Sequence, residues 1–288
     1  MELWINEIQT NNLHFSIRVK DILFAGHSEY QEIILANTEE FGYLLILDNV
    51  PQTCAFDEFI YHEMISHIPI FTHPNPKKIL IIGGGDGGTA REVLRHLDIE
   101  EIKMVEIDKL VIDVCKKYIP EHSCALVNEP NEPRFTLEIC DGIKYLKETS
   151  DYYDIIIIDS SDPIGPGKGL FSKDFYKAIY KALKPDGLFV QQTESPFYYQ
   201  KLIKRLYNDL EDIFPITKIF LASIPLYQGC LHSFTIGSKK YDPLDFENIF
   251  KRIPTDFKFK YYNKEIHKNA FSLPTFFEKL LKEKQENA

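Results

Sequence analysis

The pattern of hydrophobic positions divides the chain into two parts. Before residue 57, segments rich in β-branched and aromatic residues alternate with turn-like stretches, which predicts strands at residues 14–26, 30–38 and 43–49. From residue 78 onward, short apolar runs alternate with amphipathic segments of helical periodicity. The first part is therefore expected to form a small antiparallel β unit, and the second part an α/β domain.

The second part repeats a strand followed by a helix. The predicted strands are residues 78–82, 102–108, 134–140, 153–159, 188–194, 216–223 and 232–238. The predicted helices are residues 89–97, 109–119, 142–148, 171–185 and 196–214. Helical crossovers imply a mostly parallel, doubly wound sheet with helices on both faces. Too few residues separate the last two strands for a helical crossover, so the last strand is expected to be antiparallel.

The boundary between the parts contains a predicted helix at residues 57–71, with Asp57 and Glu58 in its first turn, where they suit the helix dipole. Two prolines in residues 73–78 end this pattern. We expect an N-terminal β domain at residues 1–56 and a Rossmann-like catalytic domain at residues 57–288. A mostly parallel sheet with an antiparallel last strand is the arrangement of S-adenosylmethionine-dependent methyltransferase-like folds.

Composition narrows the class of protein. The 288 residues are 44% hydrophobic and 26% charged, as in ordinary globular proteins. A net charge of -10 argues against a nucleic-acid binder and is compatible with a cationic small substrate. The five cysteines and nine histidines show no metal-ligand spacing, so neither a disulfide framework nor a metal site is expected. The sequence lacks signal-peptide features and a membrane-spanning apolar run, so we expect a cytoplasmic protein without membrane contact.

Two carboxylates follow the most apolar predicted strand. Four isoleucines at residues 155–158 precede Asp159 and Asp162, on a turn stiffened by Pro163 and Pro166. Ligands of open α/β sheets bind beyond the carboxyl ends of the strands. The pair therefore suggests a site for a cation, or for a proton leaving one. The alternative is that both aspartates only form the turn.

A glycine-rich loop joins the first predicted parallel strand to its helix. Gly83, Gly85 and Gly88 form a G-x-G-x-x-G pattern, which permits a tight turn and close backbone approach to a nucleoside ligand. The alternative is a turn that only serves helix–sheet packing. Asp86 places a negative charge where phosphates would bind, so it disfavours NAD and favours a ligand with a positive group.

The next two strand ends add further polar groups. Glu106 ends the second parallel strand, where a carboxylate accepts hydrogen bonds from ribose hydroxyls. Asp141 and Gly142 end the third strand, at the position that lies over adenine in this fold. Each alone is consistent with an ordinary strand end, but together they predict a nucleoside pocket.

The chain resembles the polyamine aminopropyltransferase family and is most similar to the spermidine synthases. The resemblance runs nearly end to end and is most specific in three motifs: DEFIYHEM at 57–64, GGGDGG at 83–88 and DSSDPIGP at 159–166. It implies transfer of an aminopropyl group from decarboxylated S-adenosylmethionine to a diamine, usually putrescine, giving spermidine and 5'-methylthioadenosine. It also implies no cofactor beyond this co-substrate, and a homodimer or homotetramer.

The resemblance assigns roles to individual residues. Asp159 would be the base that accepts the amine proton, with Tyr61 beside it, and Asp86 would hold the amine of the donor. The residues around the methylthioadenosine part would be Gln31, Gly83, Gly85, Glu106, Asp141, Gly142 and Pro166. The diamine would be lined by His62, Asp162, Gln52, Glu194 and Tyr227, together with Asp86 and Asp159. His232, which departs from the family pattern, is expected to line the same site. Residues 163–172 match the family's mobile gate.

The chain departs from the family pattern at two positions. His232 stands where the family has an apolar wall residue, and Ala55 stands where it often has a glutamate. A neutral imidazole can hydrogen-bond a distal amine, whereas a protonated one repels it. We therefore expect a diamine preference that is not strictly putrescine.

Amine chemistry supports separate roles for the acids. A primary amine has a pKa of about 10.4, so freeing its lone pair at pH 7 costs roughly 4 to 5 kcal/mol. One amine would stay charged at distal acids, while the other passes its proton to Asp159. The alternatives are a small-molecule methyltransferase, in which Asp86 would face the donor's carboxylate, and a non-catalytic binding protein.

Overall fold

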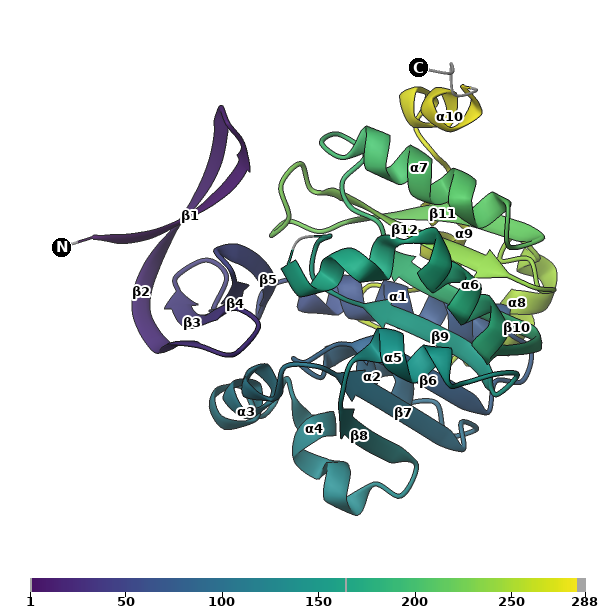
Figure 1. Cartoon of the computed structure of the whole chain (residues 1–288), viewed down its shortest axis with the longest axis horizontal. Helices are drawn as coiled ribbons and strands as arrows, with labels where there is room; N and C mark the ends of the chain where they lie inside the picture. Colours follow the sequence, from purple (N-terminus) through teal and green to yellow (C-terminus); the bar gives the residue numbers. More distant parts are fainter. Residues whose placement is uncertain (1, 164, 284–288) are drawn as a thin grey trace.

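The computed structural model of the chain describes residues 2–163 and 165–283, and of residues 165 and 166 it describes the backbone alone. Two sheets organise these residues (Figure 1). A five-stranded antiparallel sheet is built from the N-terminal strands, and a seven-stranded sheet with helices on both faces forms the rest. The predicted fold class is confirmed.

The N-terminal sheet is a simple meander in which each strand pairs with the next. Its strands are β1 (Leu3–Thr10), β2 (Leu13–His27), β3 (Glu32–Thr38), β4 (Tyr43–Leu47) and β5 (Val50–Cys54). The three predicted strands correspond to β2, β3 and β4, whereas β1 and β5 were not predicted. In β1 the inward positions are Ile5, Glu7 and Gln9, so polar residues weaken the alternation that identifies a strand. Pro51 and the short length of β5 conceal the fifth strand.

The second sheet has the strand order β11-β12-β10-β9-β6-β7-β8. Its strands are β6 (Lys78–Gly83), β7 (Glu101–Glu106), β8 (Phe135–Ile139), β9 (Tyr153–Asp159), β10 (Leu183–Gln192), β11 (Ile216–Ser223) and β12 (Leu231–Ser238). Strands β6 to β10 pair in parallel, and β12 lies antiparallel between β10 and β11. The antiparallel last strand is therefore confirmed, in a position inside the sheet.

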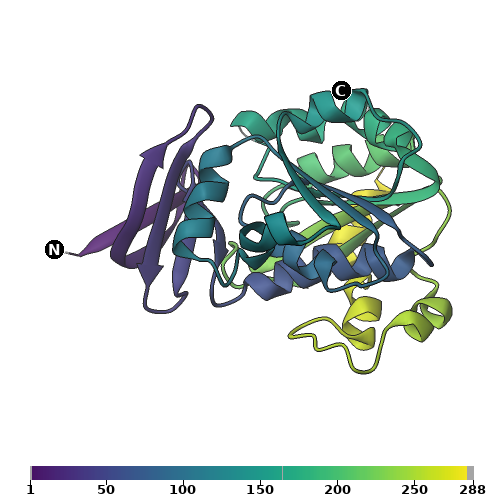
Figure 2. The ribbon, with the colours of Figure 1, turned by 90° about the horizontal axis from the view of Figure 1, so that it is seen from below.

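Helices cover both faces of this sheet (Figure 2). They are α1 (Glu58–Thr72), α2 (Gly88–Leu94), α3 (Lys109–Tyr118), α4 (Cys124–Asn128), α5 (Gly142–Lys147), α6 (Lys173–Ala182), α7 (Gln200–Glu211), α8 (Phe246–Arg252), α9 (Lys264–Ala270) and α10 (Thr275–Lys282). The isoleucines of β9 alternate between the faces: Ile155 and Ile157 pack in the cluster that contains α1 and α2, and Ile156 and Ile158 in the cluster that contains α6 and α7. The isoleucine run is thus buried on both sides, as expected for a central parallel strand.

Several predicted boundaries were wrong by three or more residues: helix α2 ends at Leu94 rather than at residue 97, strand β10 starts at Leu183 rather than at residue 188, and the bounds of α6 and α7 also differ. Helix α6 ends at Ala182 rather than at residue 185, because Leu183 already pairs with Tyr153 of the neighbouring strand. Helix α7 starts at Gln200 rather than at residue 196, because the amides of Tyr198 and Tyr199 donate to the carbonyl of Ser195 in a preceding turn. Local turn and ladder hydrogen bonds outweigh helical periodicity at both positions.

The strand order fixes where a ligand can bind. The chain runs from β6 outward to β7 and β8, and then returns to place β9 on the other side of β6. The carboxyl ends of β6 and β9 therefore flank the point at which the winding reverses, which is the usual ligand crevice of open α/β sheets. Gly83 at the end of β6 pairs with Asp159 at the end of β9.

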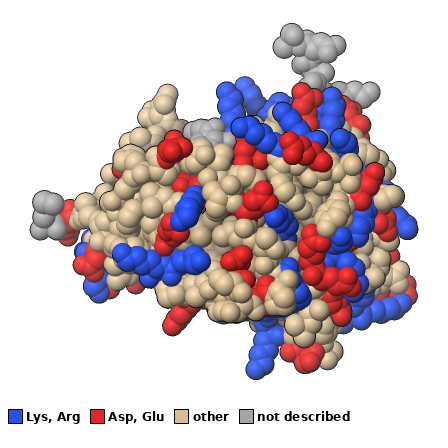
Figure 3. Space-filling view, turned by 60° about the horizontal axis from the view of Figure 1, so that its bottom comes forward, with Lys and Arg blue, Asp and Glu red and all other residues tan. Residues whose placement is uncertain are grey.

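The charged side chains on the surface and the character of the helices complete the description of the fold. Acidic and basic side chains are interspersed on the face of the molecule shown in Figure 3. Within residues 2–163 and 165–283, none of the helices combines the length and the apolar character that a membrane span requires.

Candidate active site

Two adjoining cavities lie at the carboxyl ends of the central strands. The larger has a volume of about 140 Å³ and the smaller of about 50 Å³. The residues that line both, and so mark their junction, are Gln52, Tyr61, Ser160 and Tyr227. The larger cavity also contains the predicted residues Gln31, His62, Gly83, Gly85, Asp86, Glu106, Asp141, Gly142 and Asp159. The smaller contains Asp162, Glu194 and His232. The side chain of Pro166 lies outside the described part of the chain.

The glycine loop brings the two central strands into direct contact. Gly83 has a φ of +86°, and a Cβ built on it would lie 2.0 Å from the carbonyl oxygen of Asp159. The amide of Gly84 donates to the same carbonyl at 2.7 Å. Only glycine tolerates both the backbone conformation and this approach. The loop therefore positions Asp159 as well as shaping the cavity.

Asp159 is partly buried and lines the larger cavity, next to Tyr61 and Ser160 at the junction with the smaller one. The phenol of Tyr61 donates to Oδ1 of Asp159 at 2.8 Å, while Oδ2 is buried without a hydrogen-bond partner among the described residues. Burial raises the pKa of Asp159, and the charge of Asp86 raises it further. A carboxylate with a raised pKa and a free oxygen is suited to accept a proton from a ligand.

The outer part of the larger cavity joins the two sheets. Asp108 accepts hydrogen bonds from Nε2 of Gln31 at 2.9 Å and from the hydroxyl of Ser28 at 2.6 Å. Glu106 accepts from the amide of Asp108 at 2.8 Å, and burial raises the pKa of Glu106 to about 7. The N-terminal sheet thereby contributes Gln31 to a cavity formed mainly by the α/β domain.

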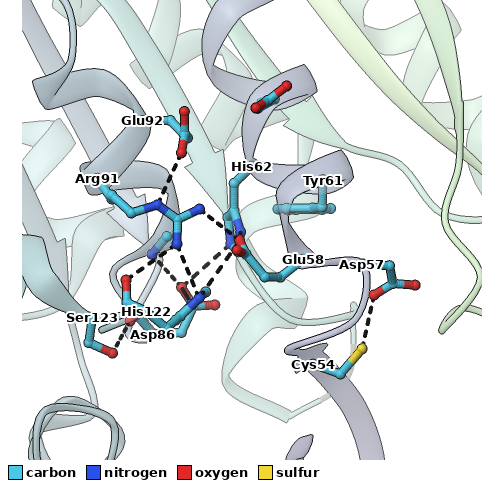
Figure 4. A network of polar contacts seen from close by, with 12 residues as sticks. Cys54, Asp57, Glu58, Tyr61, His62, Asp86, Arg91, Glu92, His122 and Ser123 are labelled. Carbon is cyan, nitrogen blue, oxygen red and sulfur yellow. Dashed lines mark hydrogen bonds and ion pairs between the residues drawn. The ribbon is translucent and has the colours of Figure 1, made fainter. Parts of the chain in front are cut away.

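The Asp86 carboxylate rests on a network of charged and polar side chains (Figure 4). Its Oδ1 lies 3.5 Å from Nε2 of His62 and 3.2 Å from Nε2 of His122. Nδ1 of His62 lies 2.7 Å from Glu58, which also accepts from Arg91 at 2.8 Å. Burial alone would lower the pKa of His62, but Asp86 and Glu58 outweigh it and raise the pKa to about 10. His62 is therefore an imidazolium between two carboxylates.

Glu58, His62 and His122 bring potential metal-ligating atoms within 4.8 Å of one another. Nη1 of Arg91 lies 3.3 Å from Nδ1 of His122, and Nη2 lies 2.8 Å from Glu58. The guanidinium already supplies positive charge to these acceptors, so the arrangement fits an ion-pair network better than a metal centre. Glu58, His122 and Arg91 were not predicted from the sequence, although the i,i+4 spacing of Glu58 and His62 is visible there.

The smaller cavity gathers three acids. Asp162 and Glu194 come from the ends of β9 and β10, and Glu7 reaches them from β1. Burial raises the pKa of Asp162 and Glu194, and raises that of Glu7 to about 7. Oε1 of Glu194 is buried without a hydrogen-bond partner among the described residues. Three acids lining one cavity, of which Glu7 and Glu194 are buried and Asp162 is partly buried, favour a cationic ligand.

Glu7 was missed from the sequence because β1 was missed. The sequence signal that could have identified Glu7 is its place in the alternating segment LWINEIQT, where Ile5, Glu7 and Gln9 share a face. An acid on the inward face of a strand is unusual unless it has a partner or a function.

His232 forms part of the wall of the smaller cavity. Its Nε2 lies 3.0 Å from Oε1 of Gln192, so Nε2 is the donor and Nδ1 is the acceptor of a neutral ring. Burial lowers the pKa of His232 to about 3, which keeps it neutral. Ala55 is exposed and lines neither cavity, so its proposed influence on specificity finds no support in the structure.

Tyr227 closes the junction opposite the acids. Its ring lies edge-on to Tyr61, with centroids 6.2 Å apart, and its phenol donates to the carbonyl of Gln52 at 2.7 Å. Asp57, predicted in the first turn of α1, directly precedes the helix and does not cap it with its side chain; its carboxylate accepts from the amide of Leu226 at 2.6 Å. These bonds fasten the segment before β12 to β5 and to the start of α1.

Comparison with known proteins assigns the chain to a family. The family model described as the spermine/spermidine synthase domain matches residues 58–248, and the one described as the spermidine synthase tetramerisation domain matches residues 3–54. The chain belongs to the spermine/spermidine synthase family. The predicted family and the predicted enzyme class, a polyamine aminopropyltransferase, are thereby confirmed.

Similar proteins span the full chain. The polyamine aminopropyltransferase of Caldicellulosiruptor bescii is 50% identical over 98% of this chain and 99% of its own length. That of Methanocaldococcus jannaschii is 48% identical over 99% of this chain and 97% of its own. A crystal structure of spermidine synthase in complex with the transition state analogue AdoDATO has a TM-score of 0.91 at 40% identity, covering 97% of this chain and 94% of that one. The spermidine synthase of Thermotoga maritima has a TM-score of 0.89 with the same identity and coverage.

Proposed function

We propose that this aminopropyltransferase transfers the aminopropyl group of decarboxylated S-adenosylmethionine to a diamine, as a step of polyamine biosynthesis. The observation that supports this best is the position of Asp159 in the larger acid-lined cavity, next to Tyr61 and Ser160, which also line the adjoining acid-lined smaller cavity. A donor with a sulfonium and an ammonium, together with a dicationic acceptor, supplies the positive charges that these acids favour.

The larger cavity would hold the donor. Glu106 would accept hydrogen bonds from the ribose, with Gln31, Asp141, Gly142 and the glycine loop around the nucleoside. Asp86 would bind the ammonium of the aminopropyl group. The pKa of Asp86 is held well below the usual range because His62 and His122 outweigh the effect of burial, so the carboxylate stays ionised. An ionised Asp86 repels a carboxylate, which disfavours a methyltransferase that uses intact S-adenosylmethionine.

The smaller cavity would anchor the far ammonium of the diamine at Asp162 and Glu194, with Glu7 as a third acid. The near amine would pass between Tyr61 and Tyr227 and give its proton to Oδ2 of Asp159. Its lone pair would then attack the methylene carbon beside the sulfonium. A C–N bond forms, the C–S bond breaks, and the electron pair of that bond stays on sulfur, giving neutral methylthioadenosine. Proximity and alignment would supply much of the acceleration.

The acceptor is proposed to be a diamine, with putrescine as the first candidate. The neutral His232 presents an acceptor nitrogen, where an apolar wall residue would present none. This polar wall supports a preference that is not limited to putrescine.

The two parts of the chain and the segment after β9 have separate proposed roles. We propose that residues 1–56 form an oligomerisation domain of a homodimer or homotetramer, in line with the name of the matching family model, and that residues 57–288 form the catalytic domain. Residues 163–172 are proposed to act as a gate, since Gly167 and Leu170 of this segment line the larger cavity; Ile164 lies outside the described residues.

Product analysis tests the function directly. The protein is incubated with decarboxylated S-adenosylmethionine and, separately, putrescine, cadaverine, 1,3-diaminopropane, agmatine or spermidine. We expect methylthioadenosine and the aminopropylated amine in equal amounts with at least one acceptor. Tight methylthioadenosine binding without turnover of any amine would instead support a non-catalytic binding protein.

A further inference from the structure

His122 lies directly behind the acid of the glycine loop. It follows α3 in the chain, is 6% exposed and does not line either cavity. Its Nε2 lies 3.2 Å from Oδ1 of Asp86, and the hydroxyl of the adjacent Ser123 donates to the Asp86 carbonyl at 2.6 Å. One short segment therefore holds both the side chain and the backbone of Asp86.

The ring of His122 is held on its other side by Arg91. Nη1 of Arg91 lies 3.3 Å from Nδ1 of His122, and a guanidinium can only donate. Nδ1 also lies 3.7 Å from Oε2 of Glu58. On the other side of the ring, Nε2 donates to Asp86, because an ionised carboxylate can only accept. Arg91 is itself fixed by Glu58 at 2.8 Å and by Glu92 at 3.0 Å. The ring of His122 is thus oriented from behind by an arginine whose own position is set by two acids (Figure 4).

Each hydrogen bond that the described residues donate to the Asp86 carboxylate goes to the same oxygen. Oδ1 accepts from the amide of Gly88 at 2.6 Å and from His122, and it faces His62 at 3.5 Å. Oδ2 is left as the oxygen available to a ligand in the larger cavity. His122 contributes an N–H donor to this arrangement, so it orients the carboxylate through Oδ1 and leaves Oδ2 towards the cavity.

We propose that His122 is a positioning residue that holds Asp86 in the orientation that binds the ammonium of the donor's aminopropyl group. This inference rests on the proposed function. It predicts a selective effect, because methylthioadenosine shares the nucleoside of the donor but lacks the ammonium.

The test compares two variants of the full chain by calorimetry. His122→Leu removes the donor, whereas His122→Gln keeps an N–H for Asp86 and an acceptor for Arg91. We expect His122→Leu to weaken binding of decarboxylated S-adenosylmethionine about ten-fold, the loss of roughly one charged hydrogen bond. Methylthioadenosine affinity should change by less than about two-fold. His122→Gln should restore most of the donor affinity.

Reference variants separate the possible outcomes. Asp86→Asn should show the same selective loss, and adding His122→Leu to it should cause little further loss, because the two residues act as a unit. His96→Leu, which removes a partly buried histidine that contacts His67 rather than Asp86, is the control and should leave both affinities unchanged.

Equal loss of both ligands in His122→Leu would overturn the inference in favour of a merely structural role. No loss of either ligand would show that His122 does not orient Asp86. Failure of the wild type to bind decarboxylated S-adenosylmethionine would contradict the proposed function itself, independently of the variants.

Discussion

The phenol of Tyr61 and the carboxylate of Asp159 form a 2.8 Å hydrogen bond between residues 98 positions apart in the chain. Tyr61 comes from the first turns of α1 and Asp159 from the end of β9, so the bond joins the helix after the N-terminal sheet to the centre of the α/β sheet. It occupies Oδ1 and leaves Oδ2 for a ligand. The bond therefore orients the proposed base and lowers its proton affinity.

Asp159→Asn tests the base. The amide keeps the volume of the carboxylate but cannot take the amine proton, so we expect kcat to fall by about 10²–10⁴-fold, the usual contribution of a general base. Methylthioadenosine binding, measured by calorimetry, should be nearly unchanged. A variant with wild-type kcat would remove Asp159 from this role.

Tyr61→Phe tests the hydrogen bond itself. The phenol stabilises the charged form of Asp159, so its removal raises the pKa of Asp159 further. A hydrogen bond to a charged group contributes about 1.5 kcal/mol, which corresponds to roughly one pKa unit. The acid limb of the kcat/KM profile should therefore move to higher pH, with little change in protein stability. An unshifted acid limb would mean that this limb reports another group.

Glu7→Gln tests the acid from the N-terminal sheet. Since the pKa of Glu7 is raised to about 7, its carboxylate forms only as the pH approaches neutrality. Putrescine stays doubly charged over this range, so its binding, measured with methylthioadenosine present, should strengthen from pH 6 to pH 8. In Glu7→Gln, putrescine binding should depend less on pH than in the wild type. Part of the pH dependence should remain, because Asp162 and Glu194 titrate together with Glu7.

The raised pKa of Glu7 also predicts that the stability of the folded protein depends on pH. A raised pKa in the folded state stabilises the fold below the ordinary pKa of a glutamate and loses that contribution as the pH rises towards about 7. The melting temperature of the ligand-free protein should therefore contain a component that falls between about pH 4.5 and pH 7. Glu7→Gln should lack that component; an identical pH dependence in variant and wild type would contradict the raised pKa.

His232→Trp tests the wall of the smaller cavity. The indole removes the acceptor nitrogen and adds volume, so we expect the relative kcat/KM values for putrescine, cadaverine, 1,3-diaminopropane, agmatine and spermidine to change. Competition assays with pairs of amines measure these ratios without separate rate constants. Unchanged ratios would exclude His232 as a determinant of specificity.

The sequence determined the features that depend on local pattern. Alternating strands and helices predict a doubly wound sheet, and such a sheet places the ends of its parallel strands along one edge. For that reason Asp159, Glu106 and Asp141 could be placed near one another before their contacts were known. The glycine loop and its Asp86 follow from the same argument, since a strand, a tight turn and a helix are each visible in the sequence.

Only the tertiary structure decided which distant groups meet these residues. Glu7 reaches the smaller cavity because the N-terminal sheet packs across the strand ends, and His122 reaches Asp86 because the segment after α3 folds under the glycine loop. Neither contact leaves a periodic pattern in the sequence. The charge of His62 and the neutrality of His232 were likewise undecided, because desolvation and neighbouring carboxylates set the pKa of a histidine, and both depend on the packed structure.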